Sequence, residues 1–496
     1  MSGSNSFDIL NFPVKTDDFR RITAYSGRQC RETPAQRVKK RKNRRAGFCC
    51  NPGEVCAIMG KTSKEGISVK IKTKTASYED VIALPRQPRK KPRRSSLVFR
   101  ALMKILSAGE LKEVGFTCEK TGMERLGRDE PCLILMNHSS FIDLKIASTL
   151  LYPRPFHIVC TSDAFVGKDW LLRRIGCIPA QKFVSDPAMV KDMIRAIRDW
   201  GSSVLMYPEA SYSFDGTATP LPDSVGKCVK LLKIPVILIR THGAFLRDPL
   251  YNGLQVRKTR VTAEMRYLLS PEEAKAMSAE QINAVLKDAF SFDNFREQRE
   301  NHVKIPEPFR ADGLNRVLYR CPHCQREGNM LGKGITLTCQ ACGKTYTLTE
   351  EGRLEAAGGS PAFTHIPDWY AWERDCVRRE LEEGTYRLDI PVRIGMLVDT
   401  RCIYMVGDGR LTHDASGFHL TGCDGKLDYR QEPLASYSLY ADYFWYEIGD
   451  MICIGDSGTL YYCFPKEPGD VVAKTRLAAE ELYKLCRPAR KTEVPV

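Results

Sequence analysis

A histidine and an aspartate five positions apart, His138 and Asp143, are the residues whose types and spacing point most directly to chemistry. On one continuous α-helix their side chains would lie about 140° apart, so they could cooperate only across a turn. The flanks predict such a turn, because the apolar run 132–136 is of the buried-strand type and Leu144–Leu151 has helical spacing. We therefore expect His138 on a loop and Asp143 in the first helical turn.

The predicted chemistry is general base catalysis. A carboxylate beside an imidazole can fix its tautomer and steady the imidazolium that forms, and the positive end of a helix favours the ionised carboxylate. Transfer of an acyl group to an alcohol needs only this base and its orienting acid, because the substrate hydroxyl is the nucleophile. Ser139 or Ser140 could cap the helix that carries Asp143. The alternative is a turn histidine that only forms hydrogen bonds.

Three further blocks follow in order: Gly176–Lys182 with an Ile-Pro pair, Tyr207–Ser213 with a Pro-Glu pair, and the apolar stretch Ile234–Ile239. Together with the His-Asp block, they resemble the glycerolipid acyltransferase family typified by lysophosphatidate acyltransferase, the PlsC-like enzymes. The resemblance covers residues 97–300. It implies that an acyl group moves from a thioester to the hydroxyl of a lysolipid.

The resemblance also implies roles for single residues. His138 is the base and Asp143 orients it, while Glu209 with Ser211 positions the acceptor hydroxyl. In the family, arginines of the second and third blocks hold the acceptor's phosphate, and this chain has Lys182 and Tyr212 in their place.

Those two departures leave the acceptor less closely predicted than the reaction. A lysine keeps the charge but loses the bidentate fork, so Lys182 is the candidate anion contact, and a tyrosine keeps only a hydrogen-bonding tip. Arg240 and His242 end the last predicted strand and could replace the missing phosphate contacts. In the alternative, His242 only hydrogen-bonds its loop.

The region 97–300 is predicted to be an α/β domain. Its strand candidates alternate with helical patterns, and chemistry in such sheets gathers at the strand ends, where His138 and Glu209 both fall. The predicted strands are 131–136, 156–160, 203–207 and 235–240, and the predicted helices are 143–151, 169–175 and 186–200, with more helix over 270–300.

Two Cys-x-x-Cys knuckles, Cys321/Cys324 and Cys339/Cys342, lie 14 residues apart. This spacing predicts a four-thiolate zinc ribbon over residues 315–350. Four thiolates leave no open coordination position, so the zinc would be structural and His323, inside the first knuckle, a bystander.

Residues 385–488 are predicted to form a β-rich module that ends in a helix over 471–486, preceded by a helix over 368–383. Strand candidates are 386–398, 401–406, 417–421, 436–439, 445–447, 451–454 and 459–464. Several strands with one C-terminal helix resemble a pleckstrin-homology-like barrel in shape, with no motif behind the resemblance, and lipid or protein binding would follow.

The net charge of +15 belongs entirely to residues 1–96, which hold 23 Lys and Arg against 8 Asp and Glu, whereas the remainder holds 52 against 52. The charge concentrates in the runs 39–45 and 89–94, which predict a flexible arm and linker with one short strand over 69–75. An amphipathic stretch, Leu97–Leu106, follows. A basic segment leading into such a helix is typical of attachment to an anionic membrane surface. The alternatives are a solvated tail, a helix that only packs on its domain, nuclear import or RNA binding.

At 496 residues the chain should contain two to four domains. Its 19 cysteines and polar first 20 residues favour a reducing cytosol, and no apolar stretch approaches the roughly 20 residues of a spanning helix. We therefore expect a cytoplasmic protein that associates with membranes peripherally.

The sequence thus predicts an O-acyltransferase of phospholipid synthesis that acts on a lysophospholipid, with 1-acylglycerol-3-phosphate as the expected acceptor. The donor is acyl-CoA or acyl carrier protein charged with an acyl chain. Three alternatives remain: a catalytically inactive lipid-binding zinc-ribbon protein, an acyltransferase with a non-phosphate acceptor, and a nucleic-acid-binding protein that uses the ribbon and the basic arm.

Overall fold

The computed structural model describes residues 61–63, 66–68, 70–184, 186–467 and 469–487. The basic run predicted at residues 39–45 lies outside these ranges. A short hairpin, β1 (Lys61–Ser63) and β2 (Gly66–Ser68), is the first described element.

The first large unit is built on a seven-stranded mixed sheet with the strand order β4-β10-β9-β5-β8-β6-β7. Five neighbouring strands, β9, β5, β8, β6 and β7, run parallel to one another, whereas β10 is antiparallel to β9. This arrangement confirms the predicted α/β domain. The strands are β4 (Thr117–Thr121), β5 (Leu133–Met136), β6 (Phe156–Thr161), β7 (Cys177–Ala180), β8 (Ser203–Met206), β9 (Val236–His242) and β10 (Thr262–Leu269).

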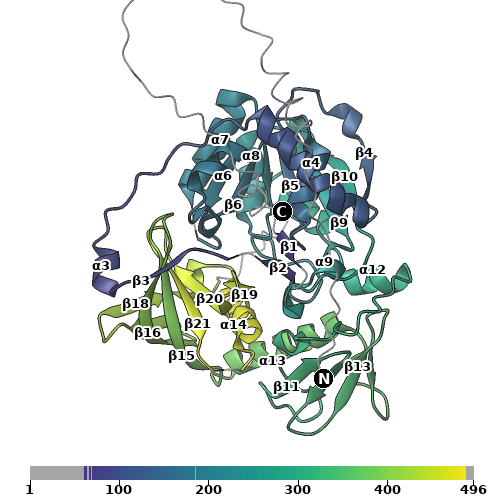
Figure 1. The fold of residues 1–496 in the computed structure, drawn as a ribbon, viewed down its shortest axis with the longest axis vertical. Coiled ribbons are helices and arrows are strands. Elements are labelled where there is room, and N and C mark those ends of the chain that lie inside the picture. Colours follow the sequence, from purple (N-terminus) through teal and green to yellow (C-terminus); the bar gives the residue numbers. More distant parts are fainter. Residues whose placement is uncertain (1–60, 64–65, 69, 185, 468, 488–496) are drawn as a thin grey trace, which may run out of the picture.

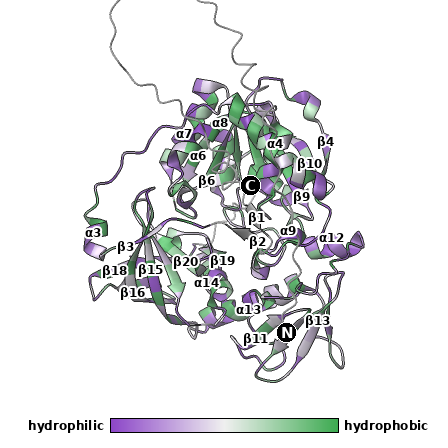
Figure 2. Ribbon diagram, viewed as in Figure 1, coloured by the Kyte–Doolittle hydropathy of each residue, from purple (hydrophilic) through white to green (hydrophobic). Residues whose placement is uncertain are grey.

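Helices cover both faces of this sheet, because the strands are apolar on both sides (Figures 1 and 2). Ile134 and Met136 of β5 pack toward α4 (Leu97–Glu113), α5 (Asp143–Leu151) and α6 (Asp169–Ile175). Leu133 and Leu135 face α7 (Pro187–Trp200), α8 (Ser224–Leu232) and α11 (Ala279–Ala289) on the other side. The short helices α9 (Ala244–Arg247), α10 (Pro271–Ala276) and α12 (Asn294–Glu300) complete the unit.

The sequence analysis missed β4, β7 and β10. β7 contains Pro179, which cannot donate to a ladder, and this proline is tolerated because β7 is the edge of the sheet. β10 alternates buried and more exposed residues, as an amphipathic strand does, but it lies between the last predicted strand, 235–240, and the helix predicted over 270–300, where no strand was expected.

Next along the chain is a small four-stranded antiparallel sheet that carries both Cys-x-x-Cys knuckles. Its strands are β11 (Met330–Lys333), β12 (Thr336–Cys339), β13 (Thr345–Leu348) and β14 (Leu354–Ala356), and helix α13 (Ile366–Glu382) follows. This sheet and α13 lie below the α/β unit in Figure 1.

The C-terminal module contains two antiparallel meanders, β15 to β18 and β19 to β21, joined because β15 also pairs with β21. Helix α14 (Val471–Cys486) packs against it through Ala473, Leu477 and Ala478. The strands are β15 (Leu388–Leu397), β16 (Ile403–Asp414), β17 (Gly417–Gly422), β18 (Leu427–Gln431), β19 (Tyr440–Trp445), β20 (Gly449–Gly455) and β21 (Leu460–Pro465). A β-rich module with a C-terminal helix is therefore confirmed, whereas its pleckstrin-homology-like character stays a resemblance of shape.

Two details of that module were predicted wrongly. β18 was not expected, and the two short strands predicted at 436–439 and 445–447 are replaced by one strand, β19. The backbone turns sharply at Phe444, Tyr446 and Glu447, whose φ angles are positive, so the chain leaves β19 where the pattern predicted a new strand.

Residues 70–96 are not the flexible linker that their charge and prolines predicted. β3 (Thr73–Thr75) pairs in parallel with β16, and the short helix α3 (Tyr78–Ile82) buries Val81 in the core of the C-terminal module. The second basic run then lies against the α/β unit, where Arg89 forms ion pairs with Asp186 and Asp192. Local acidic partners therefore order this run, and a sequence pattern read by itself cannot show them.

A buried carboxylate joins the α/β unit to the C-terminal module. Asp163 Oδ2, between β6 and α6, accepts hydrogen bonds from Tyr440 (2.8 Å), Trp445 Nε1 (3.3 Å) and Tyr462 (3.4 Å) of the module. All four residues are buried. Losing this acceptor would leave the buried hydroxyls of Tyr440 and Tyr462 without an acceptor, while Trp445 Nε1 would keep only the Tyr440 hydroxyl (2.9 Å).

We expect Asp163→Ala to lower the free energy of unfolding by about 3 kcal/mol, because unpaired buried donors carry a desolvation penalty. Urea denaturation followed by tryptophan fluorescence measures this loss. Asp199→Ala, which removes an exposed carboxylate of α7, is the matched control. Equal urea midpoints for the two variants would contradict the role of Asp163.

Candidate active site

His138 lies on the loop between β5 and α5, and Asp143 is the first residue of α5, as predicted. Asp143 Oδ2 accepts a hydrogen bond from the His138 ring at Nδ1 (3.1 Å) and from the backbone amides of Ser139 (2.8 Å) and Ser140 (3.0 Å). The expected serine cap is wrong, because Ile142 is the N-cap residue and the serines donate through their amides. The carboxylate reaches back across the turn and holds the loop and the imidazole together.

This contact determines which ring nitrogen of the histidine carries the proton. A proton on Nδ1 faces Asp143, so the ring presents Nε2, which no described residue hydrogen-bonds, as its free basic nitrogen. Burial lowers the pKa of His138 below its usual value of 6.5, although the hydrogen bond that the ring donates to Asp143 acts in the opposite direction. The imidazole is therefore neutral, and able to accept a proton, at pH 7.

Two tyrosines hold the imidazole between them. The ring centroids of Tyr207 and Tyr212 lie 4.2 Å and 4.0 Å from that of His138, in stacked geometry. Tyr212 occupies the position where the resembled family has an arginine, and here its ring supports the base. The sequence analysis considered Tyr212 only as a replacement for a phosphate contact and missed this role.

Glu209 is close to His138, but its carboxylate is occupied by protein groups. Oε2 accepts the backbone amide of His138 (3.0 Å), and Oε1 accepts the amide (2.9 Å) and hydroxyl (3.2 Å) of Thr219. Burial raises the pKa of Glu209 to about 7, against the effect of these hydrogen bonds. The geometry makes Glu209 a brace between two loops, and its contact with an acceptor hydroxyl stays a prediction. Ser211 is buried beside it, with no partner for its hydroxyl among the described residues.

Arg240 and His242 are engaged elsewhere. Arg240 forms an ion pair with Glu264 (3.1 Å), and His242 contacts both Glu264 (3.2 Å) and Glu297 (2.8 Å). Neither side chain lines the cavity that His138 faces. The structure therefore does not bring these two residues to the predicted site.

His138 opens into a cavity of about 660 Å³, within the size range of small-molecule and lipid sites. One wall comes from α4, α5, α6 and β7 of the α/β unit, including Met103, Leu144 and Leu172. The other wall comes from the C-terminal module, which sequence reasoning did not connect with the site. Lys182 also lines this cavity, with its ammonium 4.0 Å from the centre of the Tyr440 ring.

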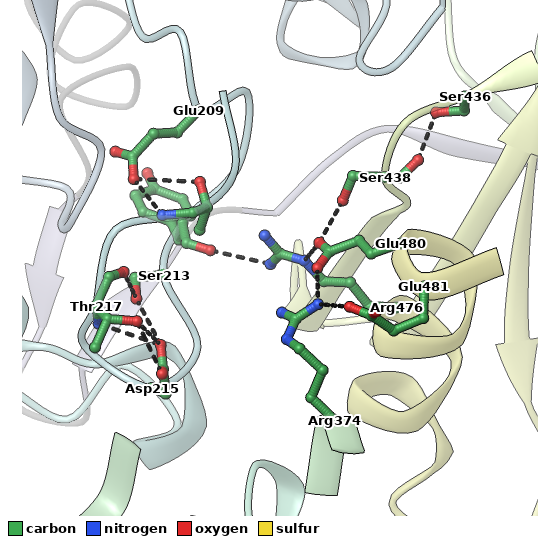
Figure 3. A network of polar contacts seen from close by, with 12 residues as sticks. Glu209, Ser213, Asp215, Thr217, Arg374, Ser436, Ser438, Arg476, Glu480 and Glu481 are labelled. Atoms are coloured by element: carbon green, nitrogen blue, oxygen red, sulfur yellow. Dashed lines mark hydrogen bonds and ion pairs between the residues drawn. The ribbon is translucent and has the colours of Figure 1, made fainter. Parts of the chain in front are cut away.

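A polar network from the C-terminal helices reaches the loop that stacks on His138 (Figure 3). Arg476 of α14 donates to the backbone carbonyl of Tyr212 (3.3 Å) and to Glu480 (3.2 Å). Arg374 of α13 donates to Glu480 (2.7 Å) and Glu481 (2.9 Å), and Ser438 adds a hydrogen bond of 2.7 Å to Glu480. Nearly all of these groups are buried, so the loop bearing Tyr212 is fixed by helices more than 150 residues later in the chain.

The four predicted cysteine ligands also come together. The sulfur atoms of Cys321, Cys324, Cys339 and Cys342 all lie within 4.8 Å of one another. Two pairs are 3.8 Å and 3.7 Å apart, close to the separation of about 3.8 Å expected for tetrahedral thiolates at 2.3 Å from zinc. The cluster is remote in sequence from His138 and shares none of the cavity's lining residues.

Comparison with known proteins agrees with this geometry. Residues 117–241 match the family model described as Acyltransferase, which spans His138, Asp143 and Glu209. This part of the chain is similar to the acyltransferase family. The PlsC-like resemblance seen in the sequence is thereby confirmed.

Two acyltransferases illustrate the similarity. The chain is 27% identical over 128 residues to the 1-acyl-sn-glycerol-3-phosphate acyltransferase BAT2, chloroplastic, of Brassica napus, which covers 25% of this chain and 36% of that protein. The chain thus spans little more than a third of this relative. A solved structure, the 1-acyl-sn-glycerophosphate (LPA) acyltransferase PlsC of Thermotoga maritima, aligns with a TM-score of 0.33 and 12% identity, over 38% of this chain and 76% of that one.

Proposed function

We propose that the protein transfers a fatty acyl group from an acyl thioester to a hydroxyl of a lysophospholipid in phospholipid synthesis. The thioester is either acyl-CoA or acyl carrier protein charged with an acyl chain. The observation that carries the proposal is the His138 imidazole, oriented by Asp143 and presenting Nε2 in a cavity with many apolar side chains. The first acceptor to test is 1-acylglycerol-3-phosphate, for which the Brassica napus relative is named. Lys182 would contact its phosphate.

The transfer follows from these positions. Nε2 takes the proton of the acceptor hydroxyl while the hydroxyl oxygen attacks the thioester carbonyl. Asp143 stabilises the imidazolium, which then gives the proton to the departing thiolate, so that an ester and a thiol are formed. The intact pair disfavours the alternative of an inactive lipid-binding protein, because lipid binding alone needs no oriented base.

We expect His138→Ala to lower kcat by about 10² to 10⁴, the usual contribution of a positioned general base. Because the pKa of His138 lies below 6.5, the acidic limb of the wild-type pH-rate profile should also fall below pH 6.5. Steady-state rates with acyl-CoA and a lysophospholipid measure both. His419→Ala, on β17 of the C-terminal module, is the control and should keep wild-type rates. Turnover by His138→Ala within a few-fold of wild type would remove this histidine from the mechanism.

We further propose that helix α4 attaches the protein to an anionic membrane surface. The inner face of α4 packs on the domain through Phe99 and Met103, whereas Leu97, Val98 and Ile105 are 54%, 55% and 56% exposed. The helix therefore packs on its domain and still presents an apolar outer face. Among the described residues, no helix has the length and apolar character needed to cross a bilayer.

Replacing Val98 and Ile105 together with aspartate should sharply reduce binding to anionic vesicles, because it places charge on the inserting face. Co-sedimentation across a salt series gives the measurement. Leu231→Asp, a similarly exposed leucine on α8 at the other face of the sheet, is the matched control and should bind like wild type. Unchanged, salt-insensitive binding by the double variant would exclude α4 as the membrane contact.

The four clustered cysteines lead to one more proposal, a structural zinc ion. Cys324→Ser should reduce the zinc content from one equivalent per chain to well under half and increase hydrogen exchange over residues 315–350, because a thiolate site couples metal binding to local folding. Elemental analysis and exchange mass spectrometry provide the readouts. Cys486→Ser, an exposed cysteine outside the cluster, should change neither. A wild-type protein purified without chelator but lacking zinc would contradict the assignment.

A further inference from the structure

The wall that the C-terminal module adds to the cavity is unusually aromatic and is held in a strained conformation. Phe444, Trp445 and Tyr446 all line the cavity, and Phe444 and Tyr446 have φ angles of 52° and 46°. Left-handed conformations cost bulky residues about 1 kcal/mol or more each, so surrounding contacts must impose them. Phe444 is held by a hydrogen bond from its amide to Asp450, and Trp445 by hydrogen bonds from its indole to Asp163 and the Tyr440 hydroxyl.

Two opposite charges line the same cavity without pairing. Lys182 comes from the loop after β7 of the α/β unit, and Asp442 comes from β19 of the C-terminal module. Across the described ranges, no ion pair within 4 Å involves either side chain; Asp442 accepts only the adjacent amide of Tyr443 (2.9 Å). Both residues are only partly exposed, and charges partly withdrawn from water are usually matched by a ligand or a partner.

Both side chains line the cavity that His138 faces. Burial lowers the pKa of His138 and raises the pKa of Asp442 to about 7, and the Lys182 ammonium acts to lower both pKa values. Tyr440 and Tyr446 in turn lie near enough to Asp442 to feel its charge. The Asp442 carboxyl group therefore shares one cavity with these tyrosines, Lys182 and His138.

An ammonium group is the ligand that this combination suits. Aromatic faces attract cations, most strongly when the cation is desolvated, and a carboxylate among the rings adds direct charge complementarity. Lys182 provides the complementary contact for a phosphate in the same cavity. A phosphate monoester by itself would bring two negative charges into the cavity that Lys182 and Asp442 both line, so this one lysine would have to offset both the phosphate and the ionised form of Asp442.

We propose that the C-terminal module completes a subsite for a zwitterionic headgroup, in which Lys182, over the Tyr440 ring, binds the phosphate and Asp442 with Trp445 and Tyr446 binds an ammonium joined to it. This inference rests on the proposed acyl transfer and names its acceptor class: a lysophospholipid whose phosphate is esterified to an amino alcohol. The C-terminal module then determines specificity as part of the active site.

The test compares acceptors that share one acyl chain and differ only in headgroup: lysophosphatidylcholine, lysophosphatidylethanolamine and lysophosphatidate. We expect kcat/KM for one or both zwitterionic acceptors to exceed that for lysophosphatidate at least 10-fold, and the two arms separate quaternary from primary ammonium. Asp442→Asn, which keeps an oxygen for the Tyr443 amide, should lower the zwitterionic values at least 10-fold and leave or raise the lysophosphatidate value. Asp424→Asn, in a turn of the same module that does not line the cavity, is the matched control.

A binding measurement separates this inference from the proposed reaction. His138→Ala protein is titrated calorimetrically with dodecylphosphocholine and with dodecyl phosphate, both below their micelle concentrations. Tighter binding of the phosphocholine that disappears in the His138→Ala/Asp442→Asn double variant would support the subsite. If the wild-type protein acylated none of the acceptors, only the proposed reaction would fail and the subsite would stand. Equal or weaker binding of the phosphocholine would overturn the subsite. Efficient lysophosphatidate turnover would also overturn it if Asp442→Asn left the ratio of kcat/KM between the zwitterionic acceptors and lysophosphatidate unchanged. Either result would leave the proposed acyl transfer standing.

Discussion

The cavity depends on one buried carboxylate at the junction of two units. Asp163 belongs to the α/β unit, and the three side chains that donate hydrogen bonds to it all come from the C-terminal module. Two of these donors, Tyr440 and Trp445, also line the cavity. The hydrogen bonds that dock the module therefore also place its aromatic wall in the cavity that His138 faces, so the docking of the module and the geometry of the cavity cannot vary independently.

His138, the proposed base, is itself supported from several directions. Asp143 holds one nitrogen, Tyr207 and Tyr212 hold the ring faces, and Glu209 holds the backbone amide. Arg476 then fixes the loop of Tyr212 from α14. A base that these contacts already hold in place needs little rearrangement when the reaction occurs, and such preorganisation is a general source of catalytic rate enhancement.

The parts of the site that could be predicted from sequence were those encoded locally. His138 and Asp143 belong to one strand-loop-helix segment, and the cysteines to two knuckles, so short spacing was enough to indicate that they meet. The roles of Arg240, Tyr212 and Asp442 depend on partners far along the chain. Arg240 looked like a phosphate contact until the antiparallel strand β10 placed Glu264 beside it, and β10 had itself been missed. The run 89–94 likewise looked like a free basic arm because its acidic partners lie about 80 to 100 residues away.

The pairing of β3 with β16 has a consequence for synthesis of the chain. Residues 73–75 leave the ribosome roughly 330 residues before residues 403–405, with which they pair. The α/β unit between them is complete much earlier, and domains generally fold as they emerge. During that interval the base can already be formed, but the cavity still lacks its aromatic wall and the N-terminal strand lacks its partner. An unfinished chain therefore lacks one wall of the cavity that His138 faces, because the lining residues within 434–446, and Tyr483, are made last.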